Sequence, residues 1–198
     1  MPKNKILAIS PHADDMELGA GGTIKKWIDN GAVCYSIVLS MLRLNRQAEI
    51  GTSHEVLGIR PENITVRDYK NRYFPEIRQA ILQEFIDFRI TPDIVLVPAT
   101  YDEHQDHQVV CQEAKRAYKK STILGYEDPW NSTSFNLPMV VRLNADQIKA
   151  KVKAVMSHKS QIHRPYMNEE FIKGLAAVRG AIIGTPYAEA FEVIRWVD

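Results

Sequence analysis

An imidazole and two adjacent carboxylates follow the first apolar run of the chain. His12, Asp14 and Asp15 come directly after Lys5–Ser10, and a glycine-rich segment, residues 19–23, follows them. Zinc accepts imidazole nitrogens and carboxylate oxygens as ligands, so this cluster could hold a metal ion beside a general base. The simpler interpretation is that Asp14 or Asp15 caps the helix that follows. A cap needs one carboxylate and leaves the other and the histidine unexplained, which favours the metal site.

A second cluster of acidic and histidine side chains follows another apolar run. Residues 101–107 read Tyr-Asp-Glu-His-Gln-Asp-His and come after the run 93–98. Because parallel strands place their C-terminal ends at one edge of a sheet, we expect the two clusters to lie close together in the fold. The alternative is two unrelated polar loops. Three of the six histidines stand at these strand ends near an aspartate, which chance placement explains poorly.

These motifs resemble those of the LmbE-like, or PIG-L-type, zinc-dependent N-deacetylases. The similar segments are residues 11–17 (Pro-His-Ala-Asp-Asp-Met-Glu), 104–107 (His-Gln-Asp-His) and 153–161 (Lys-Ala-Val-Met-Ser-His-Lys-Ser-Gln), with further matches at 46–59 and 188–192. The resemblance therefore spans nearly the whole chain. Ala13 stands where the opening motif of the family usually has proline, and this difference removes no ligand.

The resemblance implies one zinc ion per chain, although the same ligands also suit other divalent metals. The implied ligands are His12, Asp15 and His107, which leaves Asp14 as the general base. Zinc lowers the pKa of a water molecule that it binds to about 7, so a carboxylate is a sufficient proton acceptor. The residues argue for metal-assisted amide hydrolysis. The resemblance indicates the substrate, which is the N-acetyl group of an amino sugar or its conjugate.

Amide hydrolysis passes through a tetrahedral oxyanion, which needs a second hydrogen-bond donor. The candidate is His104, with Asp106 expected to hydrogen-bond one ring nitrogen, keep the imidazole protonated and aim the other N–H at the oxyanion. The alternative for His104 is an exposed loop histidine without a partner, and the alternative for Asp106 is a helix cap. The leaving amine could take its proton from Asp14 or from His104.

Two further residues are candidates for substrate binding. The resemblance places Arg46 at a substrate-binding position, although an ion pair with Glu49 at i+3 explains the spacing equally well. Asp68, at the end of a predicted strand, could accept hydrogen bonds from sugar hydroxyls or cap a turn. Trp130 could line the rim of the pocket or anchor its loop. His158 is interpreted as a packing or hydrogen-bonding residue on a helix away from the strand ends.

The apolar pattern predicts an α/β fold, because runs rich in β-branched residues alternate with segments of helical period. The predicted strands are residues 5–10, 33–39, 64–68, 94–97, 122–126, 139–143 and 190–197. The predicted helices are residues 22–30, 47–57, 75–88, 107–119, 145–162 and 168–179. This alternation predicts a three-layer sandwich with a Rossmann-like, mostly parallel sheet and helices on both faces. Without a linker or repeat in the sequence, we expect residues 1–198 to form a single domain.

Composition disfavours several classes of partner. The 198 residues are 45% hydrophobic and carry a net charge of +1, which indicates neither nucleic-acid binding nor a membrane surface. Cys34 and Cys111 are expected to be reduced core thiols. Without a signal-peptide pattern or a long apolar segment, we expect a cytoplasmic protein that does not insert into membranes. The expected partner is a small-molecule amino sugar, and residues 127–138 could support a homo-oligomer.

Two other functions stay open on the sequence, and a third is disfavoured. A catalytically silent sugar-binding relative and a metal-dependent hydrolase of another ester or amide would use the same ligand types. Nucleotide binding is disfavoured, because the glycines of residues 19–23 lack the spacing of the dinucleotide fingerprint and the chain has no Gly-Lys-Ser/Thr phosphate loop.

Overall fold

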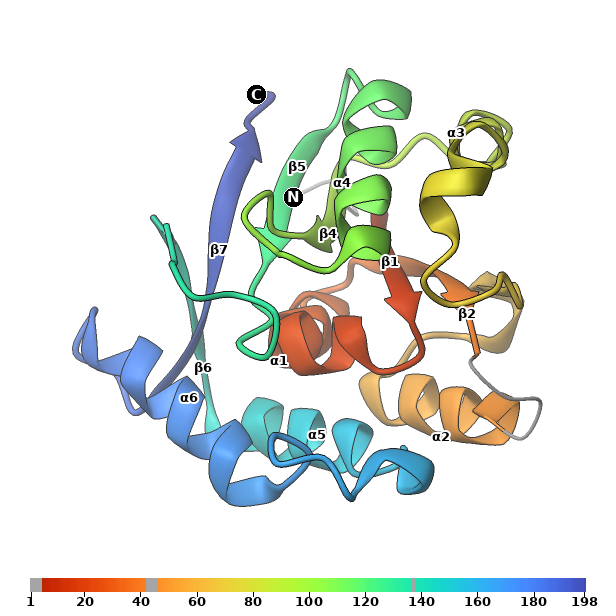
Figure 1. Ribbon diagram of the computed structural model, residues 1–198. Coiled ribbons are helices and arrows are strands. Elements are labelled where there is room, and N and C mark those ends of the chain that lie inside the picture. Colours follow the sequence, from red (N-terminus) through yellow and green to blue (C-terminus); the bar gives the residue numbers. More distant parts are fainter. Residues whose placement is uncertain (1–4, 42–45, 137) are drawn as a thin grey trace.

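The computed structural model describes residues 5–41, 46–136 and 138–198. Within these ranges one seven-stranded sheet has the order β3-β2-β1-β4-β5-β7-β6 (Figure 1). The strands are β1 (Lys5–His12), β2 (Val33–Ser40), β3 (Ile64–Val66), β4 (Ile94–Pro98), β5 (Thr122–Tyr126), β6 (Met139–Leu143) and β7 (Tyr187–Arg195). The first five strands pair in parallel, and β7 runs antiparallel to β5 and β6. The predicted mostly parallel sheet is confirmed.

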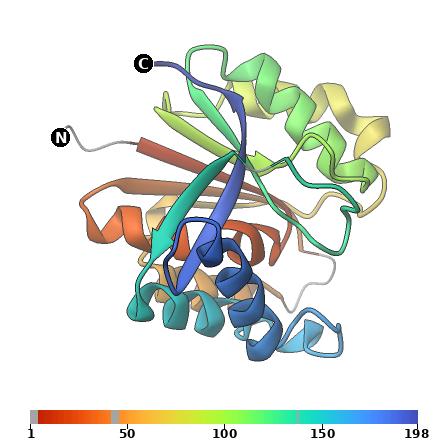
Figure 2. The ribbon, with the colours of Figure 1, turned by 90° about the vertical axis from the view of Figure 1, so that its left-hand side faces the viewer.

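Helices cover both faces of the sheet, which confirms the predicted three-layer sandwich. They are α1 (Asp15–Asp29), α2 (Gln47–Leu57), α3 (Arg78–Ile86), α4 (Gln105–Ala117), α5 (Ala145–Val155) and α6 (Glu169–Ala181). Helices α1, α2 and α5 share one apolar cluster with the sheet, and α3 and α4 share the other (Figure 1). Helix α6 packs with α1 and α5, and Figure 2 shows it below β6 and β7 at one side of the molecule.

The central strand β1 is apolar on both faces because both faces are covered. Ile6 and Ala8 pack in the cluster beneath α1, whereas Leu7 and Ile9 pack in the cluster beneath α4. A fully buried leucine or isoleucine contributes about 1.5–3 kcal/mol to folding. The strand that carries the first cluster of polar residues is therefore held firmly in the middle of the sheet.

Helix α1 begins at Asp15, seven residues before the predicted start at Gly22. The glycines at 19 and 22 lie inside this helix because neighbouring side chains approach its backbone closely. A Cβ at Gly19 would collide with the ring of Tyr126, and one at Gly22 would collide with Leu143. Close helix packing, rather than a loop, explains the glycine-rich segment.

Helix α5 ends at Val155, seven residues before its predicted end at residue 162. The backbone N–H of His158 bonds to the carbonyl of Val155 at 3.1 Å, a short-range pattern that ends a helix, and residues 159–161 form a 3₁₀ turn. Strand β3 is shorter than predicted, β7 begins three residues earlier, and α3 begins after a 3₁₀ turn at residues 74–77. The remaining ends differ by a few residues at most.

Three smaller features complete the description of the fold. The described residues of the segment 127–138, which excludes residue 137, form neither helix nor strand. Cys34 and Cys111 are both free and buried, which confirms the absence of a disulfide between them. Among the described residues, none of the helices has the length and apolar character needed to cross a bilayer.

Candidate metal centre and active site

The two clusters of polar residues meet at the C-terminal ends of β1 and β4. These strands are neighbours in the sheet, and the chain proceeds from β1 towards β2 on one side and from β4 towards β5 on the other. A reversal of this kind opens a crevice at the strand ends, where ligands of α/β proteins bind. His12 ends β1, Asp15 begins α1, and His107 lies in the first turn of α4. The predicted proximity of the two clusters is confirmed.

Three side chains converge at this point. His12 Nδ1 lies 3.3 Å from Asp15 Oδ2, His107 Nε2 lies 3.2 Å from the same oxygen, and the two ring nitrogens lie 3.2 Å apart. Zinc binds nitrogen and oxygen ligands at about 2.0–2.1 Å, which places tetrahedral ligands about 3.3 Å from one another. This set of donors therefore fits a zinc ion in type, number and spacing.

Each of the two histidines is held by a carboxylate through its other nitrogen. His12 Nε2 lies 3.0 Å from Asp106 Oδ2, and His107 Nδ1 lies 2.7 Å from Asp102 Oδ2. Histidines that bind zinc usually donate their second N–H to a carboxylate or carbonyl in this way, which fixes the ring and its tautomer. Sequence reasoning missed Asp102. The available signal was its place between the end of β4 and His107.

The predicted partner of Asp106 is wrong. Its carboxylate bonds to His12, and it also accepts the backbone N–H groups of Arg72 at 2.6 Å and of Phe74 at 3.1 Å. Asp106 lies in the first turn of α4 and points towards the end of β1, whereas His104 precedes the helix. It therefore orients His12 and does not hold a proton on His104. Its alternative role as the helix cap is also wrong, because His104 occupies the cap position.

The His104 ring is neutral rather than protonated. Its Nδ1 accepts the backbone N–H of Asp106 at 3.1 Å, so the neutral ring carries its proton on Nε2. Burial, together with the nearby His107 and His12, lowers the pKa of His104 to about 4. The ring centroids of His104 and His107 are 4.8 Å apart, so His104 borders the cluster and is not an isolated loop residue.

Carboxylates dominate the electrostatics of the cluster. Burial lowers the pKa of His12, but Asp15 and Asp106 outweigh it and raise the pKa to about 9. Asp15 and Asp102 likewise hold the pKa of His107 well above its usual value against the effect of burial. Positive charge is therefore favoured at this point. A bound cation would supply that charge and release the protons of the two rings.

Asp128 is a further buried carboxylate that sequence reasoning missed. It follows β5, and its Oδ2 lies 4.0 Å from His107 Nδ1. Burial, opposed by His107 and reinforced by Asp15, raises its pKa to about 7. Potential ligand atoms of Asp15, His107 and Asp128 lie within 4.8 Å of one another, as do those of His12, His104 and His107. An acidic residue at the end of β5 was the available signal.

Asp14 does not cap α1. It occupies the position before the helix with φ 154° and ψ −19°, and its side chain makes no capping hydrogen bond. Backbone angles of this kind are rare outside glycine and are usually maintained at functional sites. Instead, Asp14 Oδ2 accepts from Arg46 Nη2 at 3.0 Å. Burial raises the pKa of Asp14 to about 6 despite the opposing charge of Arg46.

Neither predicted substrate-binding residue presents itself to a ligand in the expected way. Arg46 is 0% exposed, and its guanidinium contacts Ala13, Asp14 and, at 3.4 Å, Glu49. The i+3 ion pair therefore exists, and the geometry favours contact with Asp14 over a direct grip on a sugar. Asp68 is exposed, and among the described residues no hydrogen bond or ion pair joins it to the cluster.

An aromatic pair lies beside the cluster. The backbone N–H of Trp130 bonds to Asp128 Oδ1 at 3.1 Å, which ties this residue to the buried carboxylate. The Trp130 side chain is 56% exposed, and its ring centroid lies 5.3 Å from that of Tyr166. The predicted alternatives for Trp130, a rim residue and a loop anchor, are both compatible with this position.

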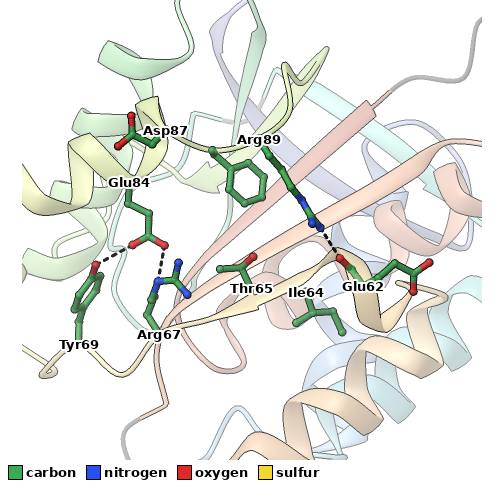
Figure 3. Close-up of a pocket in the computed structure, with 9 residues that line it drawn as sticks. Glu62, Ile64, Thr65, Arg67, Tyr69, Glu84, Asp87 and Arg89 are labelled. Atoms are coloured by element: carbon green, nitrogen blue, oxygen red, sulfur yellow. Dashed lines mark hydrogen bonds and ion pairs between the residues drawn. The ribbon is translucent and has the colours of Figure 1, made fainter.

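A surface cavity of about 530 Å³ lies beside β3 (Figure 3). Its polar side chains largely pair with one another. Arg67 Nε lies 2.8 Å from Glu84 Oε1, and the Tyr69 hydroxyl donates to Glu84 Oε2 at 2.9 Å (Figure 3). None of the residues that line this cavity belongs to the two sequence motifs.

Comparison with known proteins places these features in context. The model of the family described as PIG-L: GlcNAc-PI de-N-acetylase matches residues 7–119. The chain is similar to diacetylchitobiose deacetylase of Thermococcus kodakarensis, with 26% identity over 96% of the chain and 83% of that protein.

Solved structures share the fold. The conserved protein TT1542 from Thermus thermophilus superposes with a TM-score of 0.81 at 22% identity, over 98% of this chain and 97% of that chain. The 4-carboxy-2-hydroxymuconate hydratase of Pseudomonas putida superposes with a TM-score of 0.73 at 18% identity, over 98% of each chain. Likeness at these identities shows the fold alone. The fold therefore leaves the reaction to be argued from the residues of the site.

Proposed function

The chain belongs to the PIG-L family, whose model covers more than half of it, and we propose that it removes the N-acetyl group from an N-acetylated amino sugar or its conjugate. The observation that best supports this proposal is the convergence of His12, Asp15 and His107 within 3.3 Å of one another, beside Asp14. The relative named diacetylchitobiose deacetylase supports the substrate class.

The donor set suits one zinc ion held by His12, Asp15 and His107. When bound, zinc supplies a Lewis acid for the amide carbonyl and lowers the pKa of a water molecule to about 7. Asp106 and Asp102 keep the two rings in the tautomers that leave His12 Nδ1 and His107 Nε2 free to bind. His104 is not proposed as a ligand, because its Nε2 carries the ring proton.

Asp14 is proposed as the general base. Its carboxylate is free of the helix that follows, is adjacent in sequence to Asp15, and is held by Arg46 at 3.0 Å. It takes a proton from the attacking water as the new C–O bond forms. His104 donates its Nε2–H to the oxyanion that develops on the carbonyl oxygen. Losing such a donor typically costs 10²–10³ in rate, or about 2.7–4 kcal/mol.

Asp14 is also the proposed donor to the leaving amine. When the C–N bond breaks, the amine needs a proton, and Asp14 carries the one taken from water. His104 is a poor acid for this step. Its pKa of about 4 keeps the ring neutral, and loss of the remaining Nε2 proton would produce an imidazolate. The proton therefore moves from water to Asp14 and then to the amine.

Two variants test these roles. We expect Asp14→Asn to retain zinc and to release no acetate from N-acetylglucosamine or N,N′-diacetylchitobiose, because the amide cannot accept the proton. We expect Asp15→Ala to lose both zinc and activity, because one ligand is missing. Zinc content is measured by atomic absorption and acetate by an enzymatic assay. Full activity of Asp14→Asn would contradict the base assignment. If the wild-type protein binds zinc but releases no acetate from either compound, the proposed deacetylase function is contradicted.

A further inference from the structure

A set of acidic, arginine and histidine side chains adjoins Asp14, and apart from the contact of Arg46 with Asp14 it takes no part in the roles proposed above. Its members, called the Glu17 network here, are Glu17 of α1, Arg46, Glu49 and His54 near or within α2, and His158 after α5. Glu17, Arg46, His54 and His158 are each at most 1% exposed. Charges buried this deeply need partners, so the contacts among them decide what the network does.

One chain of contacts leads from Glu17 to Asp14. His158 Nε2 lies 3.1 Å from Glu17 Oε1, and His158 Nδ1 lies 3.4 Å from Arg46 Nη2. The same Nη2 donates to Asp14 Oδ2 at 3.0 Å and to the carbonyl oxygen of Ala13. The arginine is thus held between the histidine and the base.

A second set of contacts holds the other side of the guanidinium. Arg46 Nε lies 3.4 Å from Glu49 Oε2, and Glu49 accepts the backbone N–H of Ser160 at 2.7 Å and its hydroxyl at 2.8 Å. Both His158 and Ser160 belong to the short segment that follows the early end of α5. This segment therefore contacts Arg46 by two routes, directly through His158 and indirectly through Ser160 and Glu49.

Stability alone does not explain this network. Replacing buried ionic groups with apolar residues of similar volume is often neutral or stabilising, so a network of charges is weak evidence of a contribution to stability. The network ends on Asp14, whose φ of 154° is rarely adopted by residues other than glycine. The Asp14 carboxylate makes no capping hydrogen bond to α1, and its contact with Arg46 gives it its direction.

We propose that His158 is a positioning residue for the base: it links Glu17 to Arg46 and thereby holds the guanidinium where it orients the Asp14 carboxylate. This inference rests on the proposed function only through the role of Asp14. A displacement of about 1 Å at a reacting group can cost on the order of 10²-fold in rate, so a residue that never touches the substrate can control turnover. The effect should fall on kcat, because neither the zinc ligands nor the rim of the site changes.

The contact with Glu17 places a proton on His158. Its Nε2 lies 3.1 Å from Glu17 Oε1, a carboxylate oxygen that can only accept, so Nε2 carries a proton. The ¹⁵N chemical shifts of the ring report this state. The link to Asp14 is therefore observable without any substrate.

The first experiment compares His158→Ala with His163→Ala in the zinc-loaded enzyme, with the N-acetyl substrates above. His163 lies five residues away and is exposed, so it is the matched control. We expect His158→Ala to lower kcat by about 10- to 100-fold with KM within twofold and zinc content unchanged. We expect His163→Ala to match the wild type. Wild-type kcat in folded His158→Ala would overturn the proposal.

A double-mutant cycle separates positioning from a merely structural role. If His158 acts through Arg46, adding His158→Ala to Arg46→Met should lower kcat by less than twofold further. If the double variant instead loses kcat by the product of the factors measured for the two single variants, the two residues act independently and the proposal is overturned. If His158→Ala does not fold, His158→Asn keeps one donor and one acceptor and replaces it in the cycle.

A substrate-free measurement distinguishes failure of this inference from failure of the proposed function. In protein labelled with ¹⁵N-histidine, Asp14→Asn and Arg46→Met should both shift the His158 ring signals, and Asp87→Asn, at an exposed position after α3, should not. Unchanged His158 signals in both variants would overturn the inference even if the wild type is a deacetylase. If the two variants shift the His158 signals but the wild type has no deacetylase activity, the link between His158 and Asp14 is retained and the proposed function is rejected.

Discussion

Replacing Asp102 with alanine should weaken zinc binding about ten- to hundredfold. Asp102 is 1% exposed, and its Oδ2 accepts the His107 Nδ1–H at 2.7 Å. In its absence, the Asp128 carboxylate lies 4.0 Å from His107 Nδ1, which is beyond hydrogen-bonding distance. A buried hydrogen bond to a charged group is worth about 1.5–3 kcal/mol, and this range corresponds to roughly a ten- to hundredfold change in affinity.

The measurement is a competition titration of the metal-free protein with zinc and a fluorescent chelator at pH 7.5. Glu103→Ala is the matched control, because Glu103 is the next residue in the same loop and is exposed. We expect Asp102→Asn to lose less affinity than Asp102→Ala, because the amide oxygen can still accept the Nδ1–H. Equal zinc affinities for Asp102→Ala and the wild type would refute the argument that this carboxylate orients a metal ligand.

Three further predictions concern other parts of the molecule. Trp130→Ala should raise KM for sugar substrates about two- to tenfold with little change in kcat, because covering about 20–50 Å² of the apolar face of a sugar ring with the indole is worth about 0.5–1.3 kcal/mol. Steady-state kinetics checks this, and an unchanged KM would exclude Trp130 from the substrate site. Glu189→Gln should lower the free energy of unfolding by about 3–5 kcal/mol in urea titrations, because Glu189 pairs with Lys151 at 2.6 Å and both side chains are 3% exposed. An unfolding midpoint equal to that of the wild type would show that the Glu189–Lys151 pair contributes little to stability. Cys34 and Cys111 should not react with Ellman's reagent in the native protein and should both react in guanidinium, because burial raises the pKa of each thiol to about 12; rapid native reaction would contradict their burial.

The position of the candidate metal centre could be predicted because the proposed ligands lie in two short motifs at strand ends. His12 and Asp15 are near neighbours in the chain, and the alternation of strands and helices places residues 101–107 at the same edge of the sheet. Backbone topology alone therefore brings His107 to them. The early start of α1 was missed because glycines usually indicate loops, and here they serve close packing against Tyr126.

The partners of these side chains could not be predicted in the same way. Asp106 and His104 are two residues apart, and their spacing suggested a pair, but the first turn of α4 directs the carboxylate to His12, 94 positions earlier in the chain. His158 was placed on a helix away from the site, yet it bonds to Glu17 across 141 positions. Such contacts depend on side-chain directions and on the packing of several elements, which spacing does not encode.

The amino-acid sequence by itself determined the fold class, the edge of the sheet where the clusters meet, and the residue types available for chemistry. It could do so because hydrophobic period and strand direction are local properties of the chain. Only the tertiary structure decided that Asp102 and Asp106 each hold a histidine, that His104 is neutral, and that Arg46 is buried against Asp14. Hydrogen bonds and pKa values depend on burial and on neighbours from distant segments, which exist only after the chain has folded.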